Sequence, residues 1–269
     1  MKAEIRACIR KDFLTSVSYL LSFFLTFFDF LPLIAILYFI VKIFGQQSFA
    51  FNFGGYNITY FLFIVSGFII ATYLFPALDL FYNLMEEERG MGTLEAIFMT
   101  PTKLTIIIIS KYIWSLIFTS VVTLPISVLG FFILKIKFTF SMILAMIVIL
   151  ALLLIAFGAI AVILASSVII FIKSYPIMKI FKNVFRIFGE VYFPIVILPK
   201  SLQLFSYFLP ITYGIRAFRK ILFMGYTLSD IIPDTVVLCV FIIILWPLSF
   251  FTIRYSLKRA REKGSLSHY

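Results

Sequence analysis

The sequence has few charged residues, one histidine and two cysteines, and each of these scarcities excludes a class of protein. Charged residues make up only 13% of the chain, whereas soluble domains carry about a quarter. Hydrophobic residues make up 63% of the 269 residues, which is more than a soluble core of this size needs. The composition therefore excludes an ordinary soluble globular protein and predicts a protein that lies in a bilayer.

The shortage of histidine and cysteine leaves little material for metal or nucleophilic chemistry. His268 is the next-to-last residue, so neither a histidine-containing metal site nor a serine–histidine pair within the membrane is predicted. Cys8 lies in the basic N-terminus and Cys239 in a late apolar run, so we expect no disulfide. No G-x-x-x-x-G-K-[ST] phosphate-binding loop occurs. The sequence predicts no catalytic residues, no metal site and no bound cofactor in this chain.

The net charge of +11 comes from 23 basic and 12 acidic residues. In a soluble protein such an excess would indicate nucleic acid as a partner. In a membrane protein it is better explained by anionic lipid headgroups and by the enrichment of Lys and Arg on the cytoplasmic side. We therefore expect the lipid bilayer, and not nucleic acid, as the partner of these charges.

Long apolar runs recur along the whole sequence. Each has about the 20 residues that a helix needs to cross a bilayer core. Six transmembrane helices are predicted, at residues 19–43, 58–84, 106–134, 140–172, 177–198 and 232–255. Residues 45–57, rich in Gln, Asn, Gly and aromatic side chains, are expected to form an outer loop. The predicted fold class is an all-α membrane protein in which residues 1–269 form a single transmembrane domain.

Residues 1–18 carry apolar side chains at every fourth position from Ile5 to Val17, together with four basic residues. This pattern favours an amphipathic helix in the cytoplasmic interface over a simple extension of the first span. Under the six-span topology, 16 of the 23 Lys and Arg residues fall in inner segments and 7 in outer ones. This bias predicts that both termini lie inside.

Residues 199–224 resemble neither a plain loop nor a full span. Three residues are expected to divide the segment into short helices: Pro199, Pro210 and Gly214. We expect these helices to lie on the outer side and to dip partly into the bilayer. The basic residues of the second helix are the exception to the inner charge bias, and require a specific role on the outer face: Arg216, Arg219 and Lys220.

The segment 86–102 is a polar break between two membrane-length apolar runs, so it must lie at a membrane face. Thr93 can cap a short helix, Glu95 falls in its first turn, and Pro101 ends it. Three apolar residues share one side of this helix: Leu94, Ile97 and Phe98. The pattern fits a small docking helix for another protein, and the alternative is an ordinary loop with a solvated run of charges.

Three carboxylates within the predicted spans are candidates for intramembrane polar positions: Asp29, Asp79 and Glu190. Such groups are costly in a bilayer and rarely face lipid. Lys182, Arg186 and Glu190 are spaced four apart on one face of the predicted fifth span. Glu190 either pairs with Arg186 one helical turn earlier or lies on a polar pathway through the membrane.

Two groups of motifs carry a family resemblance. Residues 88–95 read E-R-G-M-G-T-L-E and are followed by Thr100-Pro101. About a hundred residues on, the chain reads G-E-V-Y-F-P at 189–194 and L-P-I-T-Y-G at 209–214. These motifs and their spacing resemble the type-2 ABC exporter permeases, with Gly90 in place of that family's usual acidic residue.

The resemblance implies a permease that dimerises, with itself or with a similar permease, in the cell membrane. It also implies a separate ATP-binding cassette ATPase that carries the ATP and magnesium. The loop at 86–102 would then be the coupling-helix loop, with contact residues Glu88, Arg89, Gly92, Thr93, Leu94, Glu95, Ile97, Phe98 and Pro101. The re-entrant region would include Pro194, Pro199, Pro210, Tyr213, Arg216 and Arg219.

The resemblance implies ATP-driven export, and the many Phe and Tyr residues suit a hydrophobic or amphipathic substrate. A different hypothesis is a channel or secondary transporter without ATP, in which Asp29, Asp79 and Glu190 are proton or ion sites. A third is a membrane component of an assembly that transports nothing itself.

Overall fold

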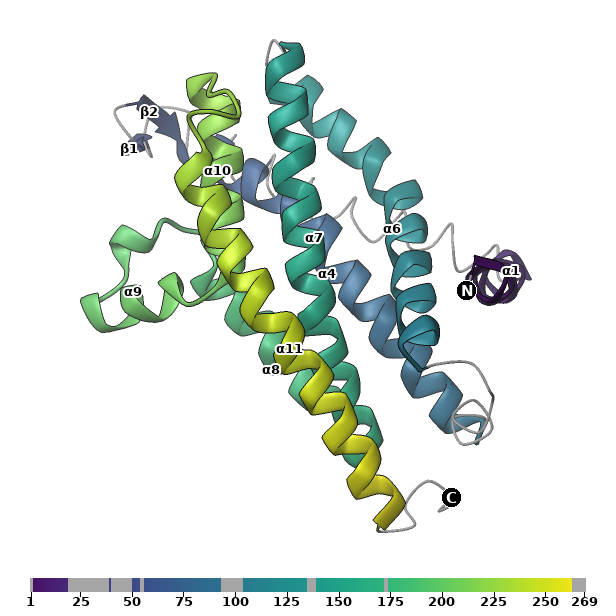
Figure 1. Ribbon diagram of the computed structural model, residues 1–269. Helices are drawn as coiled ribbons and strands as arrows, with labels where there is room; N and C mark the ends of the chain where they lie inside the picture. Colours follow the sequence, from purple (N-terminus) through teal and green to yellow (C-terminus); the bar gives the residue numbers. More distant parts are fainter. Residues whose placement is uncertain are drawn as a thin grey trace.

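The computed structural model describes residues 2–18, 39, 50–53, 56–92, 104–134, 139–171 and 174–262. These residues are predominantly helical (Figure 1). The helices are α1 (Lys2–Ser18), α4 (Tyr60–Gly90), α6 (Leu104–Leu134), α7 (Phe140–Ile170), α8 (Tyr175–Phe188), the 3-10 helix η1 (Ile195–Ile197), α9 (Lys200–Tyr207), α10 (Pro210–Met224) and α11 (Ile232–Glu262). The predicted first span, including Asp29, lies outside the described residues except for Phe39.

Four helices dominate the fold, because α4, α6, α7 and α11 each contain 31 residues. At 1.5 Å per residue each is about 46 Å long, which exceeds the thickness of a bilayer core. Among the described residues, three segments are long and apolar enough to cross a membrane: Leu62–Gly90, Phe140–Ile170 and Ile232–Arg259. The helices predicted at 58–84, 106–134, 140–172 and 232–255 are confirmed as helices.

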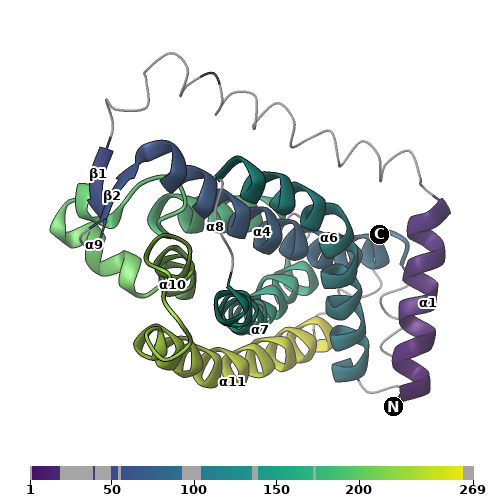
Figure 2. The same cartoon turned by 90° about the horizontal axis from the view of Figure 1, so that it is seen from above.

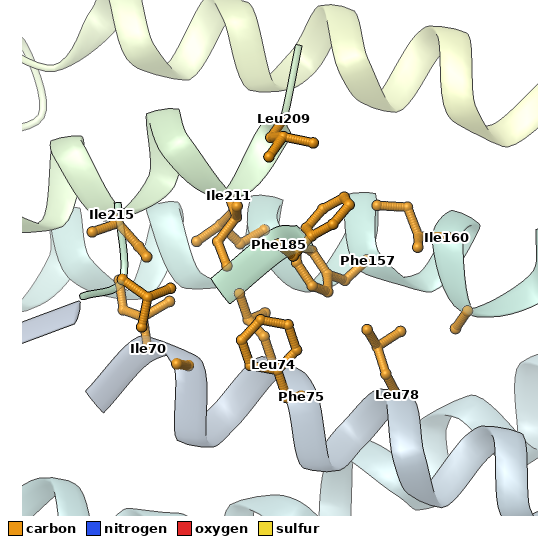
Figure 3. Close-up of a cluster of buried hydrophobic side chains, with 14 of the residues drawn as sticks. Ile70, Leu74, Phe75, Leu78, Phe157, Ile160, Phe185, Leu209, Ile211 and Ile215 are labelled. Atoms are coloured by element: carbon orange, nitrogen blue, oxygen red, sulfur yellow. The ribbon is translucent and has the colours of Figure 1, made fainter. Parts of the chain in front are cut away.

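The central helix is α7, which packs against α4, α10 and α11 (Figure 2). Its small residues allow these neighbours to approach closely. The same holds for α6, because a Cβ atom at Gly158 would lie 2.8 Å from the ring of Tyr112. Large apolar side chains from α4, α7, α8 and α10 interlock in the core, among them Leu74, Phe157 and Phe185 (Figure 3).

The predicted fifth span at 177–198 is wrong as a continuous helix. Its helical part, α8, contains only 14 residues, about 21 Å, and cannot cross a bilayer core of about 30 Å alone. After Phe188 the backbone leaves the helical conformation, and Glu190 adopts a left-handed φ of 59°. The backbone oxygen of Glu190 is bonded by Arg219 of α10 instead of within a helix, and Pro194 prevents the helix that the charge spacing favoured from continuing to residue 198.

Two further segments refine the sequence prediction. The expected loop at 45–57 ends in an antiparallel hairpin, in which β1 (Ala50–Phe53) pairs with β2 (Tyr56–Thr59). The segment 199–224 does divide into two short helices, α9 and α10, which begin after Pro199 and at Pro210. Gly214 is not a break, because it lies within α10, where a Cβ atom would meet the side chain of Leu153.

The helix α1 stands apart from the bundle and contacts α6. It is seen end-on in Figure 1 and along its length in Figure 2, so it runs across the direction of the long helices. The ring of Phe13 meets Trp114 of α6 edge to face, with ring centroids 5.8 Å apart. This crosswise orientation is the one expected of a helix that lies in a membrane interface.

Candidate functional site: two polar clusters at the ends of α4

The first cluster surrounds Glu88, in the last turn of α4, and is called the Glu88 cluster below. The Glu88 side chain is buried, and its Oε1 atom accepts hydrogen bonds from two ammonium groups. The Nζ of Lys11 on α1 lies 2.7 Å away and the Nζ of Lys111 on α6 lies 3.1 Å away. One carboxylate thus joins α4 to both α1 and α6.

Asp12 of α1 completes the charge balance of the Glu88 cluster. Its Oδ1 lies 3.8 Å from the Nζ of Lys111, and both side chains are buried. Burial raises the pKa of the Asp12 carboxyl, against the opposing effect of Lys111 and Lys11. Burial lowers the pKa of Lys11, but the hydrogen bond and charge of Glu88 outweigh this and the net pKa is raised. The fold therefore favours the charged form of Lys11 and disfavours that of Asp12.

Neighbouring residues fasten the same end of α4 to two more helices. Arg89 donates hydrogen bonds to the backbone oxygens of Val168 and Phe171, at the C-terminus of α7. A cation is favoured there because it satisfies carbonyl groups that have no partner within the helix. The hydroxyl of Tyr82 shares a hydrogen bond with Ser174, immediately before α8. The last three turns of α4 therefore contact α1, α6, α7 and the start of α8.

The second cluster surrounds Arg219 of α10 and is called the Arg219 cluster. The guanidinium is fully buried and is held mainly by uncharged groups. Its Nη2 donates to the backbone oxygens of Phe63 (3.0 Å) and Glu190 (2.7 Å), and its Nε donates to Ser66 Oγ (3.2 Å). It also lies 3.3 Å from the ring centroid of Phe63. These contacts join α10 to the first turns of α4 and to the break after α8.

The carboxylate of Glu190 faces two arginines but forms a hydrogen bond with neither. Its Oε2 lies 3.7 Å from the Nη1 of Arg219, and neither atom has a hydrogen-bond partner among the described residues. Its Oε1 lies 3.5 Å from the Nη2 of Arg216. The predicted pair of Glu190 with Arg186 is wrong, because α8 ends before Glu190; Arg186 lies over the ring of Phe75 instead.

A glycine on α4 permits the close approach in the Arg219 cluster. At Gly67 a Cβ atom would lie 2.4 Å from the backbone oxygen of Val191 and 2.7 Å from the Nη2 of Arg219. No side chain fits at these distances, so the packing of α4 against the break after α8 requires glycine here.

The remaining predicted site residues lie elsewhere. Asp79 pairs with Lys182 of α8, and both side chains are partly exposed. The ring of Tyr213 on α10 packs near Phe241 of α11, with centroids 5.9 Å apart. Pro194, Pro199 and Pro210 stand at the starts of η1, α9 and α10. Gly92 follows α4 with a left-handed φ of 69°.

Six predicted coupling residues fall outside the described part of the chain: Thr93, Leu94, Glu95, Ile97, Phe98 and Pro101. Within the described residues, no group of three or more His, Cys, Asp or Glu side chains could hold a metal ion. The sequence prediction missed Asp12 and Ser66, and also Tyr60, whose hydroxyl donates to the backbone oxygen of Tyr192. The one available signal was Lys111, since a lysine within an apolar run requires a buried anion nearby.

The profile of the ABC-2 type transporter family matches residues 3–223, which is most of the chain. The chain belongs to the ABC-2 type transporter family. A search of the curated proteins finds no match to the chain.

Membership of the ABC-2 family confirms the resemblance that the motifs at 88–101 and 189–214 indicated. The matched residues run from α1 to α10, so both clusters lie within the family's common region. ABC-2 proteins are membrane transport components, generally without catalysis of their own, that work with a separate ATP-binding subunit. The chain is accordingly a membrane permease of an ABC transporter.

Proposed function

We propose that this chain is the permease subunit of an ATP-binding cassette exporter that moves a hydrophobic or amphipathic substrate outward. The observation that carries the proposal is the junction at the C-terminal end of α4. Through Glu88, Arg89 and Tyr82 this end contacts α1, α6, α7 and the start of α8. A force applied to the loop that follows Gly92 would therefore reach four other parts of the fold.

The ATPase would bind at the predicted coupling helix. Leu94, Ile97 and Phe98 supply an apolar face that can enter a cleft, and Glu88, Arg89 and Glu95 supply charges that fix the register. ATP and magnesium would be held by the partner ATPase. Closure of the ATPase pair would push on this helix and tilt the long helices between inward-open and outward-open arrangements.

The topology that we propose keeps six crossings in the cell membrane with both termini in the cytoplasm. Four of them are α4, α6, α7 and α11, and the first is the predicted span at 19–43. The fifth is a broken crossing, formed by α8 and the non-helical residues after it. Two copies of the chain, or one copy and a similar permease, would enclose the substrate pathway.

The channel or secondary-transporter hypothesis gains no specific support. Two of its three carboxylates, Asp79 and Glu190, face the cations of Lys182, Arg216 and Arg219. This is the arrangement of structural ion pairs. The third, Asp29, lies outside the described residues.

The proposal is tested by affinity purification in mild detergent, with identification of the co-purified subunit and its stoichiometry. We expect a soluble ATPase with a phosphate-binding loop, in equal number with the permease. The double variant Leu94→Asp/Phe98→Asp should lose this ATPase, because two carboxylates cannot enter an apolar cleft without a large desolvation cost.

The matched control places two carboxylates on the exposed end of α11, as Lys258→Asp/Arg259→Asp. It should retain the ATPase. If the Leu94→Asp/Phe98→Asp protein holds as much ATPase as the wild type, the coupling-helix assignment is wrong. If no ATPase accompanies the wild type, the exporter proposal itself is wrong.

A further inference from the structure

The non-helical segment after α8 needs hydrogen-bond partners for its backbone groups, which a helix would supply by itself. Backbone groups outside helices and sheets need other partners, and within a membrane they are tolerated only where the protein supplies them. From Gly189 to Pro194 the chain is non-helical, and Glu190 and Val191 are buried. The carbonyl groups of this segment therefore need donors from elsewhere in the fold.

The Pro194 carbonyl accepts locally from the N–H of Ile197, whereas the two side-chain donors that reach the carbonyls of this segment are both tied to the first turns of α4. The hydroxyl of Tyr60, the first residue of α4, donates to the backbone oxygen of Tyr192 at 3.0 Å. Arg219 donates to the backbone oxygen of Glu190 at 2.7 Å, and the same Nη2 group also binds Phe63 on α4. A guanidinium can do this because its donors form a rigid planar fork.

The left-handed backbone at Glu190 depends on the same contact. A φ of 59° is unfavourable for a residue with a side chain. Such a conformation persists where surrounding contacts hold it, and here the bond from Arg219 holds the Glu190 carbonyl. Gly67 admits this segment against α4 at distances that no other residue allows.

We propose that Arg219 is a positioning residue that fastens the non-helical segment 189–194 to α4, so that this segment moves with α4 during transport. The inference rests on the proposed function in one respect, since the movement of α4 is taken to follow ATP binding by the partner. The structural half of the inference, that Arg219 holds the segment 189–194 against α4, does not depend on that function.

The structural half is tested on the permease alone in lipid nanodiscs, by amide hydrogen–deuterium exchange read by mass spectrometry. Arg219→Lys keeps the charge and removes the fork, and Tyr60→Phe removes only the second bond. In both variants we expect peptides from 189–198 to exchange about threefold to tenfold faster, as the loss of one or two hydrogen bonds implies. Peptides from α11 should be unchanged.

The matched control is Tyr207→Phe, which removes a hydroxyl from the exposed helix α9. It should exchange as the wild type does. Wild-type exchange at 189–198 in both Arg219→Lys and Tyr60→Phe would overturn the fastening, whether or not an ATPase partner exists.

The second half is tested on the complex with its co-purified ATPase, with and without ATP and vanadate. In the wild type, trapping should change the exchange of 189–198 together with that of α4. In Arg219→Lys, α4 should still respond while 189–198 does not, a separation that a purely structural role would not produce. If both regions respond in Arg219→Lys as in the wild type, Arg219 does not couple them. Absence of any ATPase would count against the exporter proposal alone.

Discussion

The two ends of α4 are held by opposite kinds of contact. At the C-terminal end, the Glu88 carboxylate lies within 3.1 Å of two ammonium groups, and one of them, on Lys11, is 62% exposed. At the N-terminal end, the buried guanidinium of Arg219 binds uncharged oxygens, while its carboxylate partner Glu190 stays 3.7 Å away. About 33 Å of helix separates Ser66 from Glu88.

The difference has a physical consequence. Ion pairs near solvent contribute little free energy and rearrange easily, whereas a buried charge without its partners is costly. At the Glu88 end only the pair with the exposed Lys11 is near solvent, and this contact is suited to change when another protein pushes on the adjacent loop, whereas the pair with Lys111 is buried. The Arg219 end is suited to keep its contacts and to carry the segment 189–194 with it.

The largest effect is expected from removal of the buried guanidinium. Arg219→Leu leaves two backbone oxygens buried without their donor and removes one of the two cations that face the Glu190 carboxylate, so the free energy of unfolding should fall by about 3–5 kcal/mol. Glu190→Gln should cost only about 1 kcal/mol, because the amide oxygen can still accept from the N–H of Ile195 and the guanidinium of Arg219 keeps its three hydrogen bonds. Thermal unfolding in detergent measures both. Equal losses would contradict the claim that neutral oxygens hold Arg219.

A smaller effect is expected from one added methyl group at the same end of α4. Gly67→Ala forces a Cβ atom to within 2.4 Å of the Val191 oxygen, and the repacking should cost about 1–3 kcal/mol. Gly90→Ala, near the Glu88 cluster, is the matched control because nothing lies within 4 Å of its Cβ. The same unfolding assay compares them. Similar stability of the two variants would show that the N-terminal end of α4 is not tightly packed.

Substitutions of the two carboxylates in the Glu88 cluster should change the free energy of unfolding less, and by different amounts. Glu88→Gln removes the charge closest to the buried Lys111 and should lower the unfolding free energy by about 1–2 kcal/mol. Asp12→Asn should leave it unchanged or slightly raise it at pH 7, because the fold disfavours the charged Asp12. If Asp12→Asn destabilises as much as Glu88→Gln, the pair with Lys111 is stronger than its 3.8 Å distance implies.

The Asp12 carboxyl also predicts how the stability of the fold depends on pH. The folded pKa of Asp12 is raised above 3.8, so the folded state binds this proton more strongly than the unfolded state. Its contribution to stability therefore falls as the pH rises from about 3.8 through the raised value. Unfolding measured against pH should show this fall in the wild type and its absence in Asp12→Asn.

Much of the fold could be predicted from local patterns. The four long helices follow from apolar runs bounded by polar residues, and the pair α9 and α10 follows from Pro199 and Pro210. The fifth span could not be predicted, because its charge spacing favours a helix. The hydrogen bond that holds the non-helical backbone at Glu190 comes from Arg219, which lies 29 residues later in the chain. The hairpin at 50–59 was not predicted because its residues resemble a loop.

The candidate site was predictable only in part. Glu88 and Arg89 stand out because they lie in a polar break between apolar runs. Their partners do not, because Lys11 and Lys111 are 77 and 23 residues away from Glu88 in the sequence. Arg219 was noticed as an outer basic residue, but its burial against α4 depends on tertiary packing that no local pattern encodes.

The most direct test of the account compares the two ends of the bundle in living cells. A photo-crosslinking amino acid is placed at Met91, which is 70% exposed beside the Glu88 cluster, and in a second protein at Phe140, which is 80% exposed at the start of α7. The account predicts that Met91 captures an ATP-binding subunit and that Phe140 does not. Capture of that subunit from Phe140, or no capture from Met91, would contradict it.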